Sequence, residues 1–82
     1  GQDVLIQMLD RDRLKIVHQM GESEIERTMV NAARGLALIR AQDAIEVLED
    51  VSRRDSNLKV REAALAALRT IQSETIKAGT EA

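Results

Sequence analysis

The 82-residue sequence contains no cysteine, proline, phenylalanine, tyrosine or tryptophan. Without cysteine there is no disulfide framework and no thiolate chemistry. Without aromatic rings there is no platform on which bases or sugars can stack. The formal net charge of -2 argues against a general polyanion-binding protein. Apolar residues nevertheless make up 44% of the chain and charged residues 32%, so it can bury a core, and that core has to be aliphatic.

Long apolar runs are missing as well. The longest, such as residues 36–39, fall far short of the ~18 residues that span a bilayer. No basic start is followed by an apolar stretch and a small-residue cleavage site, so no signal peptide is visible. The sequence therefore predicts a cytoplasmic protein with no membrane partner.

The residues that are present favour α-helix throughout. Apolar residues recur at spacings of three and four, and good helix formers dominate. Because proline is absent, helix ends must come from caps and glycine. The pattern predicts helices over about 23–39, 43–53 and 57–73. Asn57 is the predicted N-cap of the last helix, and Ser23 with Glu26 has the pattern of a capping box.

Each predicted helix has an inward-facing stripe. A short linker, 54–56, predicts that the last two helices form an antiparallel hairpin. For residues 2–20 the sequence leaves open one helix or two, since Asp10-Arg11-Asp12 either interrupts the helix or bends it. The predicted inward residues are Leu5, Met8, Leu9, Leu14, Val17, Met20, Ile25, Met29, Ala32, Ala33, Leu36, Ile39, Ile45, Leu48, Val51, Val60, Ala63, Ala64, Ala67, Leu68 and Ile71.

The two halves of the chain repeat each other with a period of about 31 or 32 residues. Leu14-x-x-Val17-x-x-Met20 aligns with Ile45-x-x-Leu48-x-x-Val51. Ala32-x-x-Gly35-Leu36-x-x-Ile39 aligns with Ala64-x-x-Ala67-Leu68-x-x-Ile71. Helix pairs at this period predict an α-solenoid, in which each hairpin buries its face against the next.

The repeat resembles a known family. The run Asp55-Ser56-Asn57-Leu58-Lys59-Val60-Arg61, followed by Ala64, Ala67-Leu68 and Ile71, is similar to the second helix of a HEAT repeat, and more closely to the bacterial PBS-lyase HEAT-like subtype. Residues 32–48 (AARGLALIRAQDAIEVL) are similar to the junction between two such repeats. The resemblance covers about residues 23–72.

The resemblance implies an all-α fold, a short right-handed α-solenoid of antiparallel hairpins with four to five helices. The expected organisation is one domain over 1–82. It comprises an extra N-terminal helix at 1–10, repeats at about 13–39 and 42–73, and a frayed tail at 76–82. In the family, an aspartate and an arginine form a ladder between repeats, and Asp55 and Arg61 occupy those positions, with Glu22 and Arg27 a loose substitute in the first repeat. Gly35, inside a helix, should cost ~1 kcal/mol relative to alanine, so close packing is expected there.

Candidate catalytic chemistry is sparse. His18 is the only histidine and is interpreted as a surface residue. The Asp10-Arg11-Asp12 run begins like a calcium loop, but Leu14 stands where an oxygen ligand belongs. The basic group of Arg53, Arg54, Lys59, Arg61 and Arg69 is offset by acidic neighbours. We therefore expect no enzyme activity, no cofactor and no metal, and we disfavour nucleic acid as a partner.

The predicted function is a non-catalytic scaffold that binds another protein or further repeats of the same chain. Because two repeats are fewer than a solenoid normally needs, we expect a fragment of a longer chain or a self-associating homo-oligomer. In that hypothesis the alanine-rich helix over 60–71 offers an apolar flank to the next repeat, a partner or a second copy. Alternatives are a subunit of a bilin lyase-type chaperone–enzyme, a helical dimerisation bundle or a DNA-backbone-binding module. The predicted partner-binding residues, placed on a concave surface by the resemblance, are Arg27, Arg34, Glu62, Leu65, Arg69 and Gln72.

Overall fold

A computed structural model describes residues 2–81, and the side chains of residues 3–73. Across that range every regular element is helical, which confirms the all-α prediction and its upper number of five α-helices. The order is α1 (Gln2–Gln7), α2 (Arg11–Ile16), α3 (Glu22–Leu38), a 3₁₀ turn η1 (Gln42–Ala44), α4 (Ile45–Arg54) and α5 (Leu58–Glu81).

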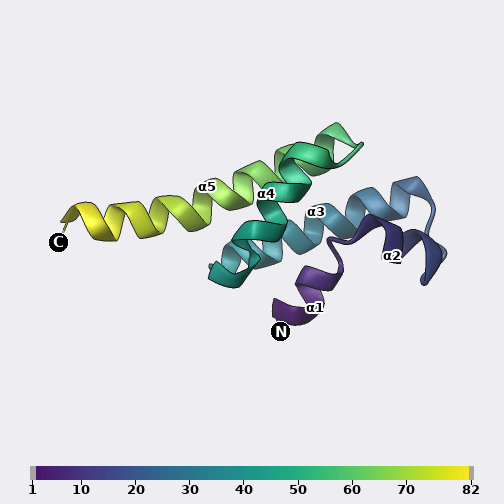
Figure 1. Cartoon of the computed structure of the whole chain (residues 1–82), viewed down its shortest axis with the longest axis horizontal. Helices are drawn as coiled ribbons and strands as arrows, with labels where there is room; N and C mark the ends of the chain where they lie inside the picture. The colour runs from purple at the N-terminus through teal and green to yellow at the C-terminus, as the bar shows by residue number, and fades with distance from the viewer. Residues whose placement is uncertain (1, 82) are drawn as a thin grey trace.

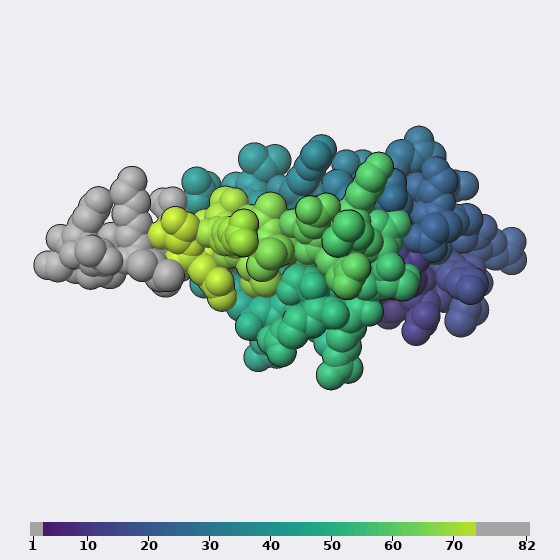
Figure 2. Space-filling view, turned by 90° about the horizontal axis from the view of Figure 1, so that it is seen from above, coloured from purple at the N-terminus to yellow at the C-terminus, as the bar shows by residue number. Residues whose placement is uncertain are grey.

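The two long helices α3 and α5 organise the molecule. They pack side by side and run in the same direction, and α4 returns from the end of α3 to the start of α5 and packs on α5 (Figure 1). Seen from above, α5 lies along the middle, with α3 on one side and α4 on the other (Figure 2). The short helices α1 and α2 pack on α3. The long helices are therefore neighbours although a whole helix separates them in sequence.

The N-terminal segment forms two short helices rather than one. Asp10 has an extended backbone (φ -93°, ψ 97°) and accepts a hydrogen bond from the Arg13 backbone N–H, so it is the N-cap of α2. The Asp10-Arg11-Asp12 run thus interrupts the helix. The chain leaves α2 after Ile16, and Val17 is 61% exposed. The predicted equivalence of Val17 with the buried Leu48 is wrong, because α2 ends before reaching it.

The start of α3 also differs from the prediction. Gly21 is the N-cap, without a side-chain capping bond, and Ser23 lies inside the first turn. The predicted capping box at Ser23 is therefore wrong. The carboxylate of Glu22, the first helical residue, binds Arg11 and Asn57, and these tertiary contacts draw Glu22 into the helix.

The end of α3 explains a second difference. The Ala41 N–H donates to the Leu36 carbonyl at 3.0 Å, and the Arg40 N–H donates to the Ala37 carbonyl at 3.1 Å. This is the Schellman pattern, and Arg40 takes the left-handed conformation (φ 49°) that it requires. The turn leaves Ile39 55% exposed rather than inward as predicted.

The N-cap of α5 is as predicted. The Asn57 side-chain oxygen accepts hydrogen bonds from the Lys59 N–H at 2.8 Å and the Val60 N–H at 3.2 Å. The helix continues to Glu81, beyond the predicted end near Ser73. The side chains of the predicted frayed tail, 76–82, lie outside the described residues.

The core is aliphatic and continuous through all the helices. Its buried members are Leu9, Leu14, Ile25, Met29, Ala32, Ala33, Leu36, Ala41, Ala44, Leu48, Val51, Val60, Ala64, Ala67, Leu68 and Ile71. Most of the predicted inward stripes are confirmed by this set. The inner face of α5, with Val60, Ala64 and Ile71, is buried within the chain.

Gly35 has the close contact expected of it. A Cβ at this position would lie 3.1 Å from the Leu5 Cδ1 atom. The missing side chain therefore lets α1 seat Leu5 directly on the α3 backbone, which offsets the helical cost of glycine.

Candidate functional site

A groove runs between α3 and α5. Its volume is about 930 Å³. Small apolar side chains supplied by both helices form its floor, namely Val30, Ala37, Ala63, Ala66 and Ala67. Longer and mostly polar side chains border it, namely Glu26, Arg27, Asn31, Arg34, Leu38, Arg40, Lys59, Glu62 and Thr70. Alanine makes the floor because the two helix axes approach closely only where side chains are small.

The groove carries positive charge on an acidic chain. Its border holds four basic side chains and two acidic ones, a balance of +2, whereas the whole chain has a net charge of -2. The basic residues are Arg27, Arg34, Arg40 and Lys59, and the acidic residues are Glu26 and Glu62. The groove therefore differs in sign from the protein around it.

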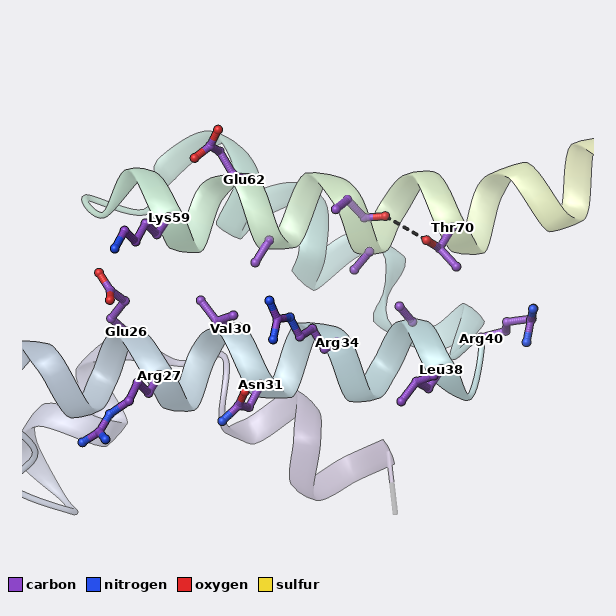
Figure 3. Close-up of a pocket in the computed structure, with 14 residues that line it drawn as sticks. Glu26, Arg27, Val30, Asn31, Arg34, Leu38, Arg40, Lys59, Glu62 and Thr70 are labelled. Atoms are coloured by element: carbon purple, nitrogen blue, oxygen red, sulfur yellow. Dashed lines mark hydrogen bonds between the residues drawn. The ribbon is translucent and has the colours of Figure 1, made fainter.

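Three of the groove cations are not used by the fold. Within the described part of the chain, Arg27, Arg34 and Lys59 make no side-chain hydrogen bond or ion pair. Glu26, in contrast, accepts a hydrogen bond from the Asn57 amide nitrogen at 3.0 Å. Figure 3 shows Arg34 pointing from α3 toward α5, and Glu26 facing Lys59 at one end of the groove. The free charge in the groove is thus mainly cationic.

Three of the predicted partner-binding residues border the groove, namely Arg27, Arg34 and Glu62. Leu65, Arg69 and Gln72 are exposed on α5 but do not line the groove. The assignment of all six to partner binding stays a prediction.

Sequence reasoning missed several groove residues, among them Val30, Asn31, Lys59, Ala66 and Thr70. Lys59, Ala66 and Thr70 lie on α5 at spacings of seven and four, which place them on one helical face. That pattern could have indicated a shared face. It could not have indicated that Val30 and Asn31 of α3 stand opposite.

A second polar site ties the N-terminal segment to the start of α5. Its members, called here the Arg11 cluster, are Arg11, Glu22, Glu26, Asp55 and Asn57. Arg11 donates from Nε to Asp55 Oδ1 at 2.9 Å and from Nη2 to Asp55 Oδ2 at 2.7 Å. Its Nη1 donates to Glu22 Oε1 at 2.6 Å, and the Asn57 side chain donates to both glutamates. One guanidinium thus joins three segments that are distant in sequence.

The ionisation of the cluster follows from these contacts. The hydrogen bond to Asp55 raises the pKa of Arg11 above its ordinary value, against the effect of burial. Burial opposes ionisation of Asp55, but hydrogen bonds from Arg11 and the Asn57 backbone N–H lower its pKa overall. Hydrogen bonds from Asn57 and then Arg11 lower the pKa of Glu22. The cluster is therefore held in its charged form.

The ladder implied by the resemblance takes a different form here. Asp55 is part of the interhelical contact, but its ion-pair partner is Arg11 rather than Arg61. The Arg61 Nε atom is buried without a hydrogen-bond partner among the described residues. The positive charge of Arg61 still lowers the pKa of Asp55. Arg11 takes the place expected of Arg61 because it binds both carboxylate oxygens of Asp55 at once.

A second hollow lies where α2 meets α4, and it holds two ion pairs. Arg11 is bound to Asp55, and Arg54 lies 3.1 Å from Asp50. In the groove between α3 and α5, by contrast, Arg27, Arg34 and Lys59 make no ion pair within the described residues. That groove is therefore the better candidate for a binding site.

Other chemistry has little support in residues 3–73. His18 is exposed, as the sequence predicted. In that described part, no three His, Cys, Asp or Glu side chains come together in a group that could hold a metal ion. None of the described helices combines the length and apolar character needed to cross a membrane.

The fold defines the class of this chain as an all-α protein of five helices. Comparison with known protein families, with curated proteins and with solved structures found no match.

Proposed function

We propose that this chain is a non-catalytic protein–protein interaction module built from two HEAT-like hairpins, and that the groove between α3 and α5 is its binding surface. The observation that carries the proposal is the combination of a small apolar floor with cations that the fold does not use. Apolar contact supplies affinity, and unpaired charge supplies orientation and selectivity.

Three features support the repeat architecture within this proposal. The helices α3 and α5 pack in parallel, as the second helices of successive hairpins do in a solenoid. The Asn57 side chain at the start of α5 donates to Glu22 and Glu26 at the start of α3. These bonds tie together the starts of the two helices that the proposal treats as equivalent. Small residues on both helices permit their close approach.

The chemistry of the groove favours recognition of a protein over catalysis. Its unpaired charged groups within the described residues are the cations Arg27, Arg34 and Lys59 and the carboxylate of Glu62, and its floor is alanine and valine. The Thr70 hydroxyl donates to the Ala66 carbonyl, so it is already engaged. Such a surface binds by shape, apolar area and charge.

Site-specific photo-crosslinking tests the proposal. A photoreactive amino acid is placed at Asn31 in the groove, and in a matched variant at Glu46, which is exposed on α4. In cells that naturally express the chain, we expect protein adducts from Asn31 and not from Glu46. Each partner identified is then measured with purified Arg34→Ala and Arg69→Ala variants. Only Arg34→Ala should weaken binding, by about threefold to tenfold.

Two results would count against this function. Adducts of equal yield at both positions would place binding outside the groove. Partners whose affinity is unchanged by Arg34→Ala would show that the groove cations take no part.

A further inference from the structure

We infer that the groove between α3 and α5 receives an acidic amphipathic helix of about three turns. This inference rests on the proposed function, since it names the partner for the same surface. Arg27, Arg34 and Lys59 are unpaired within the described residues, and the groove is basic while the chain is acidic. A complementary partner presents carboxylates, because opposite charges across an interface steer association and suppress wrong partners.

The groove walls favour a helical occupant over an extended one. An extended segment brings a row of backbone N–H and C=O groups that need hydrogen-bond partners. The floor of alanine and valine side chains offers none, and the Thr70 hydroxyl is already bound to Ala66. A helix satisfies its own backbone. It also packs closely against two parallel helices when the contact residues are small.

The dimensions of the groove set the length of the occupant. On α3 the groove runs from Glu26 to Leu38, and on α5 from Lys59 to Thr70. At about 1.5 Å per residue, the α5 wall spans ~17 Å, or about three helical turns. A segment of about twelve residues therefore fills it.

The positions of the cations set the pattern of acidic residues. Lys59 faces Glu26 at one end of the groove, and Arg34 points into it further along the opposite wall (Figure 3). Arg34 follows Glu26 by about two helical turns, or ~12 Å. The occupant should therefore carry two carboxylates about eight positions apart, one facing Lys59 and the other facing Arg34. Glu62 is also unpaired, so the single position of the occupant that faces Glu62 should not be acidic.

Tryptophan fluorescence gives a direct binding test because the chain has no aromatic residue. The probe is a synthetic helical peptide with a Leu/Ala stripe, one Trp on that stripe and Glu on both flanks at the inferred spacing. A matched peptide has Lys in place of each Glu. We expect the purified chain to bind the acidic peptide at least about tenfold more tightly than the basic one at low salt, and less so at high salt.

Matched variants locate the binding. Arg34→Glu should weaken binding of the acidic peptide at least about fivefold and strengthen binding of the basic one. Arg69→Glu, the same change at an exposed position of α5 that does not line the groove, should alter either affinity by less than about twofold. Ala66→Leu narrows the groove and should weaken the acidic peptide, and Gln72→Leu should not. Circular dichroism confirms that each variant keeps its helical content.

The outcomes separate this inference from the proposed function. If Ala66→Leu weakens the binding of both peptides, and the acidic and basic peptides bind equally well, the groove remains a binding surface but the inference of an acidic partner is wrong. If Ala66→Leu and Arg34→Glu leave both peptides unaffected, neither the acidic helix nor the groove is supported. If the acidic peptide does not bind at concentrations up to millimolar, the inference of an acidic helical partner is overturned. Crosslinking at Asn31 then still tests whether the groove is a binding surface. A wild-type dimer that Arg34→Glu makes monomeric would show that a second copy is the occupant, and overturn the inference.

Discussion

Arg11 and Asp55, separated by 44 residues in sequence, form a two-point ion pair with hydrogen bonds of 2.9 Å and 2.7 Å. The Asp55 side chain is only 5% exposed and the Arg11 side chain 19%. The pair joins the beginning of α2 to the loop before α5. It is therefore the polar contact that holds the N-terminal segment against the rest of the fold.

A double-mutant cycle should show strong coupling between these two residues. Arg11→Ala leaves the buried Asp55 carboxylate without its cation, and Asp55→Ala leaves Arg11 bound only to Glu22. Each change should therefore lower the free energy of unfolding by about 2–3 kcal/mol. Their coupling should be about 1–3 kcal/mol, measured by urea unfolding. The exposed pair Glu49–Arg53 serves as the control, with coupling below about 0.5 kcal/mol.

If the alanine variants fail to fold, Arg11→Lys keeps the test available. Lysine preserves the charge but cannot form the two-point contact, so a partial loss of stability is expected. Coupling as weak as that of the control pair would contradict the importance assigned to Arg11 and Asp55.

Stability should fall in acid through the same cluster. The pKa of Asp55 is lowered in the folded chain, as is that of Glu22. The unfolded chain therefore binds protons first, so the contribution of these groups is complete above the unfolded Asp value of about 3.9 and is lost as pH falls through the lower folded pKa. Urea unfolding from pH 2.5 to 7 measures the difference in the free energy of unfolding between wild type and Asp55→Asn. This difference should be constant above about pH 5 and should shrink below about pH 4. A difference that stays constant down to pH 2.5 would refute a lowered pKa of Asp55.

The contact between Leu5 and Gly35 predicts that the effect of Gly35→Ala on stability depends on the residue at position 5. Alanine at position 35 gains about 1 kcal/mol of helix propensity, but its Cβ would lie 3.1 Å from the Leu5 Cδ1 atom. We expect Gly35→Ala to stabilise the Leu5→Ala variant by about 1 kcal/mol and the wild type by clearly less. Equal gains in both backgrounds, measured by urea unfolding, would show that Leu5 does not pack on Gly35.

The turn after α2 offers a stabilising change. Gln19 has a positive φ of 52°, in the left-handed region that favours glycine. Gln19→Gly should therefore raise the free energy of unfolding by up to about 1 kcal/mol, after the greater freedom of glycine in the unfolded chain is counted. Gln19→Ala, which keeps the conformational cost, is the control and should bring no gain in thermal midpoint.

Local signals explain which structural expectations hold. The stripes in α3, α4 and α5 follow from apolar spacing, which fixes the face that a helix buries. The Asn57 cap follows from a side chain that binds amides two and three residues away. Ser23 had an equally good capping pattern, yet Gly21 starts α3 because Glu22 is engaged by Arg11 and Asn57. Tertiary contacts outweighed the local preference there.

The sequence by itself determined an all-helical chain with an aliphatic core, because helix propensity and periodicity are properties of neighbouring residues. The core needs no aromatic residues, because alanine and aliphatic side chains fill the space between closely packed helices. Only the tertiary structure decided that α3 and α5 lie side by side, that their facing sides leave a basic groove, and that Arg11 rather than Arg61 binds Asp55. These contacts join residues far apart in the chain, and their geometry depends on where each short turn sends the helix that follows it.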